Sequence, residues 1–189
     1  MNQPDPRQLL LNIVRILDEL HIPYLITGGM AVFLWGRPRF TADIDIIVEL
    51  EKNQTDNLYN AVRALGAAGY LDRDAMSEAI KKGGEFNFID GDTGMKVDFW
   101  LAKQTPFDRS RFERRIPLPI LGTTVFFTSP EDLIIIKLLW YNESHSSRHL
   151  EDIESILAIS EKRLDLRYIR EQTKELGIHN LFKKITQTQ

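Results

Sequence analysis

Apolar residues recur every three or four positions near the start of the chain, and this period predicts an amphipathic helix over residues 5–22. Asp5 is expected to cap this helix, and Pro6 suits its first turn. The apolar face comprises Leu9, Leu10, Ile13, Ile16, Leu17 and Leu20.

The following segment alternates between strand and helix signals around a pair of glycines. An apolar run at 23–27 predicts a short buried strand, which stops at Gly28 and Gly29. Residues 30–35 suit a short helix, and 43–50 read as the next strand. The order is therefore strand, glycine turn, helix and strand.

The rest of the chain predicts more strands and then helices only. We expect a helix at 54–69, two strands within 85–102 around the turn "GDTG", and short strands at 114–120 and 123–128. Ser129 caps a helix that has Pro130 at its first position. The predicted fold class is α/β (α+β), with a mixed sheet flanked by helices. Its core is 1–128, and a helical extension follows at 129–189.

Composition narrows the classes of function. The 189 residues include no cysteine, which excludes disulfides and thiolate chemistry and fits a reducing cytoplasm. No signal peptide or membrane span is evident, so we expect a soluble cytoplasmic protein without a membrane partner. A net charge of -3 argues against bulk electrostatic capture of nucleic acid.

Two aspartates one residue apart stand at the head of the strand 43–50. Side chains at positions i and i+2 of a strand share a face, so Asp43 and Asp45 are expected side by side. Such carboxylates raise one another's pKa unless a cation lies between them, and a hard divalent ion suits oxygen ligands. In the alternative interpretation, Asp43 caps the strand and Asp45 faces solvent.

A third carboxylate occurs in the alternating strand "KVDFWL". Asp98 lies on the face opposite Val97 and Phe99. Three carboxylates on two strands can hold two magnesium ions about 3.5–4 Å apart, an arrangement that supports in-line phosphoryl chemistry. The third carboxylate can also accept the proton of an attacking hydroxyl.

The glycine turn can supply donors to phosphate groups. Gly28 and Gly29 let backbone N–H groups approach a triphosphate, and the following helix adds its positive end. Arg39 and Thr41 come next, just before the paired aspartates. This order is more informative than any of its parts alone.

These residues resemble the nucleotidyltransferases of the DNA polymerase β superfamily. The matching stretches are "GGMAVFLWGRPRFTADIDI" and "KVDFW". The Gly-Gly pair, the arginine and the threonine before D-x-D are most similar to the branch of AbiEii-like abortive-infection toxins and aminoglycoside and lincosamide transferases. That branch often continues with a helical lysine, an arginine and an aspartate, here Lys137, Arg148 and Asp152.

The resemblance implies transfer of a nucleoside monophosphate from an NTP, such as ATP, to an acceptor hydroxyl, with release of pyrophosphate. It implies that Asp43 and Asp45 bind both magnesium ions, while Asp98 binds one and activates the acceptor. Gly28 and Gly29 would hold the triphosphate. Arg39, Thr41 and Lys137 would complete the nucleotide site, with Arg39 and Lys137 offsetting phosphate charge. The acceptor could be a small molecule, a tRNA or a protein, and an antitoxin is a possible partner.

Two other functions fit the same residues: a noncatalytic nucleotide-binding or toxin–antitoxin module, and a metal-dependent nuclease.

Three local patterns also have alternative interpretations. His145 and His149 could share a helical face and bind zinc, although the glutamate of a zinc protease is absent. The arginines of "RSRFERR" could bind nucleic acid, but a solvated loop is favoured. Lys137 could reach solvent from its apolar helix.

Overall fold

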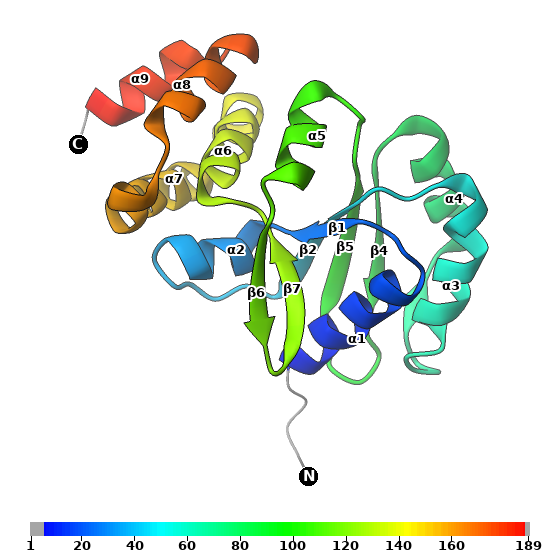
Figure 1. Ribbon diagram of the computed structural model, residues 1–189. Helices are drawn as coiled ribbons and strands as arrows, with labels where there is room; N and C mark the ends of the chain where they lie inside the picture. The colour runs from blue at the N-terminus through cyan, green and yellow to red at the C-terminus, as the bar shows by residue number, and fades with distance from the viewer. Residues whose placement is uncertain (1–5, 188–189) are drawn as a thin grey trace.

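A seven-stranded mixed sheet runs through the protein, which a computed structural model describes over residues 6–187 (Figure 1). The strand order is β3-β4-β5-β2-β1-β7-β6. Strands β2 and β5 are parallel, as are β1 and β7, and the other pairs are antiparallel. The strands are β1 (Tyr24–Ile26), β2 (Asp43–Val48), β3 (Tyr70–Leu71), β4 (Glu85–Ile89), β5 (Lys96–Leu101), β6 (Ile116–Ile120) and β7 (Thr123–Phe127).

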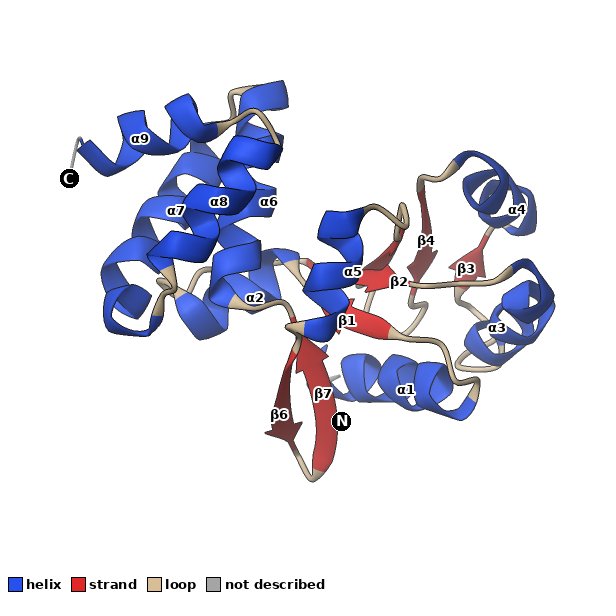
Figure 2. Ribbon diagram, turned by 45° about the horizontal axis from the view of Figure 1, so that its top comes forward, coloured by secondary structure: helices blue, strands red, loops and turns tan. Residues whose placement is uncertain are grey.

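Helices flank this sheet, and the last four form a separate group beside it (Figures 1 and 2). This confirms the predicted fold class, including the helical C-terminal extension. The helices are α1 (Pro6–Glu19), α2 (Gly28–Trp35), α3 (Thr55–Arg63), α4 (Arg73–Lys82), α5 (Pro106–Glu113), α6 (Pro130–Ser144), α7 (Ser147–Ser160), α8 (Leu166–Glu175) and α9 (His179–Gln187), with short 3-10 turns at Lys52–Gln54 and Glu161–Arg163. The predicted cap Asp5 lies outside the described residues.

The structure differs from the sequence prediction in three helices. The predicted helix 54–69 ends at Arg63, before the glycines of "GAAG". Helix α4 was not predicted, although Asp72 caps it by accepting hydrogen bonds from the backbone N–H groups of Asp74 and Ala75. The segment "RSRFERR", predicted to be a solvated loop, begins within α5 instead.

The arginines of "RSRFERR" mostly contact the protein itself, which explains why the loop prediction was wrong. Arg111 is buried and pairs with Asp108 one turn earlier on α5. Arg114 lies over the Tyr168 ring, with its guanidinium carbon 3.8 Å from the ring centroid. The Arg114 contact joins this segment to α8, and both arginines are used in packing within the protein.

Alternating apolar residues build the core beneath the sheet. Ile44 and Ile46 of β2 are fully buried, and Phe86 and Phe99 stack across β4 and β5 with ring centroids 4.9 Å apart.

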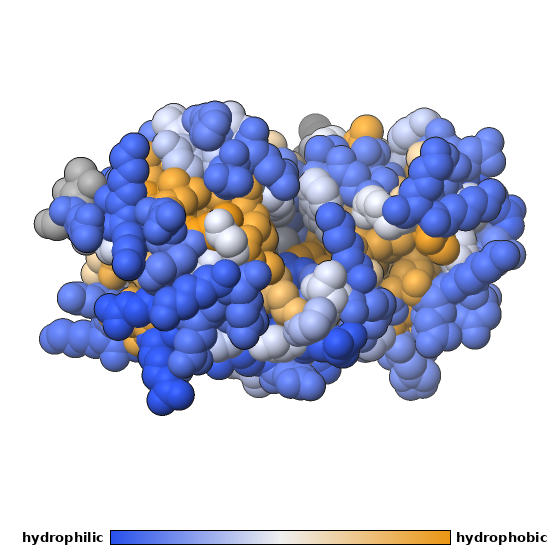
Figure 3. Space-filling model, turned by 90° about the horizontal axis from the view of Figure 1, so that it is seen from above, coloured by the Kyte–Doolittle hydropathy of each residue, from blue (hydrophilic) through white to orange (hydrophobic). Residues whose placement is uncertain are grey.

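Seen from above, hydrophobic atoms remain visible over the helical group and over the opposite end of the molecule (Figure 3). None of the described helices is long and apolar enough to cross a membrane.

Candidate active site

Strand register brings the three predicted aspartates to one place. Asp45 of β2 lies directly opposite Asp98 of β5, and Asp43 lies opposite Lys96. Asp43 and Asp45 therefore share a face, as the i, i+2 spacing predicts, and Asp98 lies on that face of the neighbouring strand. Asp98 is 6% exposed, so this carboxylate is almost entirely removed from water.

Like charge accumulates at Asp45. Burial raises the pKa of Asp45, and the carboxylates of Asp43 and Asp98 raise it further. The ammonium of Lys137 lowers it, without cancelling the other effects. A cation bound among these carboxylates would relieve this repulsion.

The flanking carboxylates have partners within the protein. Thr41 donates a hydrogen bond from Oγ1 to Oδ1 of Asp43 over 2.7 Å. Lys96 Nζ lies 2.8 Å from Oδ2 of Asp98, so the ammonium neutralises that carboxylate. In these side-chain conformations, no three acidic or histidine residues within 6–187 are grouped as a metal site.

Magnesium nevertheless fits this place by its donor set and backbone positions. The three groups are oxygen donors, which magnesium prefers, and the β2–β5 register holds their backbones side by side. Burial and the neighbouring carboxylates raise the pKa of Asp45, and a bound cation would offset the effect of those carboxylates. If Asp98 bound the metal through Oδ2, its ion pair with Lys96 would have to open.

Both glycines of the turn are required by close packing. Gly28 has φ +60°, and a Cβ there would lie 1.8 Å from Oδ2 of Asp45. A Cβ on Gly29 would lie 2.5 Å from Oγ1 of Thr41. The glycines start α2 and bring its N-terminal backbone directly against the acidic residues. Because the two glycines have no side chains, Asp45 and Thr41 can pack directly against them. The same lack of side chains is predicted to let phosphates approach the backbone.

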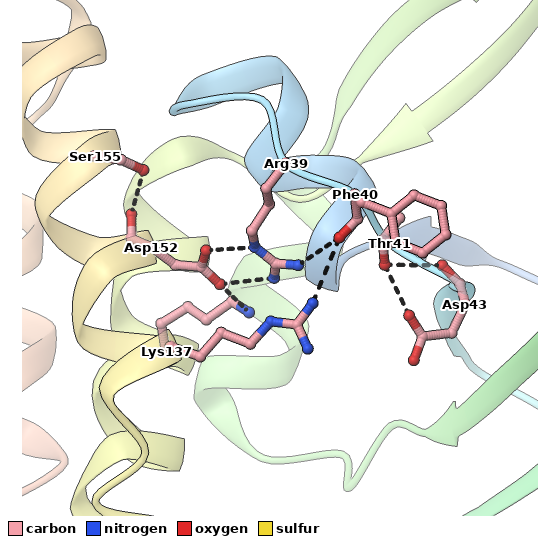
Figure 4. A network of polar contacts seen from close by, with 8 residues as sticks. Arg39, Phe40, Thr41, Asp43, Lys137, Asp152 and Ser155 are labelled. Carbon is pink, nitrogen blue, oxygen red and sulfur yellow. Dashed lines mark hydrogen bonds and ion pairs between the residues drawn. The ribbon is translucent and has the colours of Figure 1, made fainter.

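A cluster of cations around Asp152 lies beside the acidic residues (Figure 4). Arg39 donates from Nε and Nη2 to the two carboxylate oxygens of Asp152 over 2.8 and 3.0 Å. Lys137 Nζ lies 2.8 Å from Oδ2 of the same carboxylate. Lys137 is only 3% exposed, so it does not reach solvent along its helix.

Opposing effects set the protonation of this cluster. Burial alone would raise the pKa of Asp152, but hydrogen bonds and charge from Arg39 and Lys137 lower it overall. Burial lowers the pKa of Lys137, and Asp152 opposes that shift. Asp152 is thus ionised, and it fixes the direction of both cations.

Tight packing of α2 on α7 brings the cluster together. Ser160 donates to the backbone oxygen of Trp35 over 2.6 Å, and a Cβ on Gly36 would lie 2.5 Å from the Ser155 hydroxyl. The segment after α2 therefore lies directly on α7, which carries Asp152. This explains how Arg39 reaches a partner more than a hundred residues away in sequence.

A cavity of about 350 Å³ joins the acidic and cationic groups. It is lined by Gly29, Arg39, Thr41, Asp43, Asp45, Trp100, Lys137, Trp140, Glu143, Ser144, Arg148 and His149. Most of the residues singled out from the sequence line it, whereas Gly28, Asp98 and Asp152 are not among the lining residues.

Sequence reasoning missed the aromatic part of this wall. Lys137 and Trp140 are three residues apart on α6 and so lie on one helical face, a spacing visible in the sequence. Trp100 likewise follows Asp98 at i+2 on β5. Both spacings were available, but neither residue type by itself suggests catalysis.

The possible zinc pair is not on one helix. His145 ends α6 in a left-handed conformation, with φ 52°, and His149 belongs to α7. The helix breaks between them, so the i, i+4 spacing does not place these side chains on a common face. His149 instead packs against Trp140, with ring centroids 5.5 Å apart.

Solved structures with the same fold include proteins named an adenylyltransferase and a nucleotidyltransferase-like protein. The antibiotic-resistance factor ANT(2'')-Ia, solved in complex with adenylyl-2''-tobramycin, has a TM-score of 0.59 and 19% identity over 90% of this chain and 99% of that one. The lincosamide antibiotic adenylyltransferase LnuA, bound to lincomycin, has a TM-score of 0.54 and 14% identity over 84% and 99%. An antigenic nucleotidyltransferase-like protein from Paracoccidioides brasiliensis has a TM-score of 0.52 and 21% identity over 94% and 91%.

These likenesses define the fold as that of the nucleotidyltransferases. The family model described as nucleotidyl transferase AbiEii toxin, type IV toxin–antitoxin system, matches residues 10–182. The chain therefore belongs to the AbiEii nucleotidyltransferase family, in agreement with the resemblance seen in the sequence. No curated protein matches the chain significantly.

Proposed function

We propose that this protein is a magnesium-dependent enzyme that transfers a nucleoside monophosphate from an NTP to an acceptor hydroxyl and releases pyrophosphate. The observation that carries the proposal is the register of β2 and β5, which sets Asp45 opposite Asp98 and leaves Asp43 beside them. The paired aspartates open into the same cavity as Lys137 and Arg39. Carboxylates for a metal and cations for phosphates thus face one space.

Each residue has a distinct part in the proposed reaction. Asp43 and Asp45 would hold magnesium, and Asp98 would complete the set. Bound magnesium would neutralise phosphate charge and stabilise the attacking and leaving oxygens. A carboxylate oxygen of Asp98 would accept the proton of the acceptor hydroxyl, provided that it separates from Lys96.

The nucleotide would be held mainly through its phosphates. The backbone N–H of Gly29 lies in the first turn of α2, where the helix has its positive end. Arg39 and Lys137 share the single negative charge of Asp152, so the cluster keeps a net positive charge toward the cavity. Thr41 keeps Asp43 in place through its hydrogen bond.

The names of the relatives suggest which substrates to test first. One structural neighbour is an antibiotic-resistance factor solved with an adenylylated tobramycin, and another is named a lincosamide antibiotic adenylyltransferase, so ATP is the first donor to try. The family description names a toxin of a type IV toxin–antitoxin system, so an antitoxin is a candidate partner. The acceptor classes are small hydroxyl compounds, tRNA and proteins.

The proposal is tested by incubating the protein with magnesium and each NTP, together with separate pools of small molecules, tRNA and protein. Pyrophosphate release that depends on one pool, and nucleotide label in that pool, are expected. Asp45→Asn is the matched inactive control. Cleavage of RNA or DNA without NTP would instead identify a nuclease. Nucleotide binding without pyrophosphate release from any pool would identify a noncatalytic binding module.

A further inference from the structure

An aromatic surface forms one side of the cavity. Trp100 of β5, Trp140 of α6 and His149 of α7 all line it. The ring centroids of Trp100 and Trp140 are 6.0 Å apart, and those of Trp140 and His149 are 5.5 Å apart. The three rings therefore form one continuous surface, contributed by three separate elements.

This surface is not simply part of the core. Each of the three rings is only partly buried, although the same elements carry fully buried apolar residues such as Phe99, Leu138 and Ile153. A large aromatic side chain that is left half in contact with a cavity can still bury apolar area against a ligand. The rings therefore leave part of their apolar surface available to a planar or apolar group of a ligand.

His149 contributes a neutral ring to this surface. Burial lowers its pKa, and the nearby charges of Lys137 and Arg148 lower it further, although Asp152 opposes them. The imidazole is thus uncharged at neutral pH and packs against Trp140 as an aromatic ring. The aromatic surface adds no positive charge of its own, in contrast to the cations next to it.

The aromatic surface is contiguous with the phosphate-binding cations. Lys137 precedes Trp140 by one turn of α6, and its Nζ lies 5.2 Å from the centroid of the Trp140 ring. A ligand whose phosphates reach Lys137 would therefore have its next group over Trp140. In an NTP, the group attached beyond the phosphates is a ribose that carries a planar aromatic base.

We propose that Trp140, flanked by Trp100 and His149, binds the nucleobase of the NTP by stacking. This inference rests on the proposed nucleotidyltransferase function and assigns the part of the site that holds the donor's base. A base is the substrate part that combines a planar face with a covalently attached polyanion, which matches rings beside Lys137 and Arg39. Stacking tolerates any base, so the surface strengthens binding of all four NTPs.

Binding measurements that compare NTPs with inorganic tripolyphosphate isolate this contribution. Tripolyphosphate has the phosphates without ribose or base, and both ligands are measured with magnesium by calorimetry. Trp140→Ala is expected to weaken NTP binding about tenfold, because loss of aromatic stacking on a base is commonly of that size. Its tripolyphosphate affinity is expected to stay within about twofold of wild type.

Two further variants sharpen the test. Trp140→Phe keeps a ring and should restore most of the NTP affinity. Tyr141→Ala removes the neighbouring aromatic residue of α6, which packs on His145 and does not line the cavity, and should change neither affinity. If Trp140→Ala does not fold, His149→Ala provides the same comparison from α7, with a smaller expected loss.

The outcomes separate this inference from the function on which it rests. Equal weakening of NTP and tripolyphosphate would show that Trp140 only supports Lys137, and unchanged affinity for both would show that the base binds elsewhere. Either result overturns the stacking proposal and leaves the nucleotidyltransferase intact. If wild type binds neither ligand, the proposed function itself fails, and the inference fails with it.

Discussion

The acidic and cationic sides of the cavity are built in different ways. The acidic side comes from two adjacent parallel strands, whose register alone sets Asp45 opposite Asp98. The cationic side comes from a loop and two helices, where Arg39 and Lys137 meet on Asp152. One side follows from backbone hydrogen bonding, whereas the other depends on how the helical extension packs against α2.

The two sides also differ in whether their charges are compensated. On the acidic side, burial and neighbouring carboxylates raise the pKa of Asp45. On the cationic side, Asp152 already neutralises part of the charge, and its own pKa is lowered. The carboxylate of Asp45 is therefore less fully compensated than that of Asp152, and a bound cation would offset the remaining repulsion on the acidic side.

The largest expected effect comes from removing a carboxylate of the acidic side. Asp43→Asn and Asp45→Asn should each reduce transfer by about 10³-fold or more, because several kcal/mol of charge stabilisation depend on the metal site. Magnesium-dependent NTP binding should also weaken, while the metal-free fold stays intact because repulsion is relieved. Calorimetry with and without magnesium checks this. Unchanged affinity in both variants would show that the paired-metal assignment is wrong.

A smaller but clear effect is expected at the glycine turn. Gly29→Val should lower NTP affinity about 100-fold, or about 2.7 kcal/mol, because the side chain blocks the backbone and displaces Thr41. The cost to folding should be lower, at about 1–2 kcal/mol, since Thr41 is only half-buried. Gly84→Ala is the matched control, because a Cβ there meets nothing within 4 Å. Equal losses of stability and affinity would indicate a purely structural turn.

Loss of a cation from the cationic side should reduce both stability and binding. Lys137→Met should destabilise the fold by up to about 3 kcal/mol, because it removes one partner of a buried ion pair. It should also weaken NTP binding about tenfold, through loss of a phosphate-binding charge. In the single variant Asp152 still pairs with Arg39, so adding Asp152→Asn should leave Arg39 without that partner and recover neither stability nor affinity. Recovery of both would show that Lys137 acts only on the fold.

The smallest effect concerns the pH dependence of folding. The pKa of Asp45 is raised above its ordinary value of 3.8, so the folded state binds more protons than the unfolded state just above that pH. Asp45 therefore makes the protein less stable as pH rises through this window. The stability gained in Asp45→Asn should grow from acid toward neutral pH and then level off, as measured by urea unfolding. A gain that shrinks as pH rises would contradict the sign of this shift.

Much of the acidic side could be predicted from the sequence, because alternation in a strand fixes which side chains share a face. The pattern "DIDIIV" places its aspartates on the face of the strand that points away from Ile44 and Ile46. In "KVDFWL", Asp98 likewise lies on the face that points away from Val97 and Phe99. The glycine pair was also predicted as a turn at the start of a helix. Its tight packing against Asp45 and Thr41 requires coordinates.

The cationic side could not be derived from any local pattern. Arg39 and Asp152 lie far apart in sequence, and only the packing of α2 on α7 brings them together. Resemblance to a family pointed to Lys137, Arg148 and Asp152, but it did not show that Asp152 binds Lys137. The missed helix α5 did carry a signal, since Thr105 and Asp108 form a capping box with Pro106 between them. The arginines that follow obscured it.

The most direct test of the proposed transfer reaction is pyrophosphate release by wild type and Asp98→Asn in the presence of magnesium, NTP and the acceptor found by screening. Asp98 is held by Lys96 at 2.8 Å, so a purely structural ion pair is the competing explanation. If Asp98 takes the acceptor proton, the variant should release pyrophosphate at least about 10²-fold more slowly while retaining most of its NTP affinity. Release at the wild-type rate would remove Asp98 from the mechanism and contradict the three-carboxylate site.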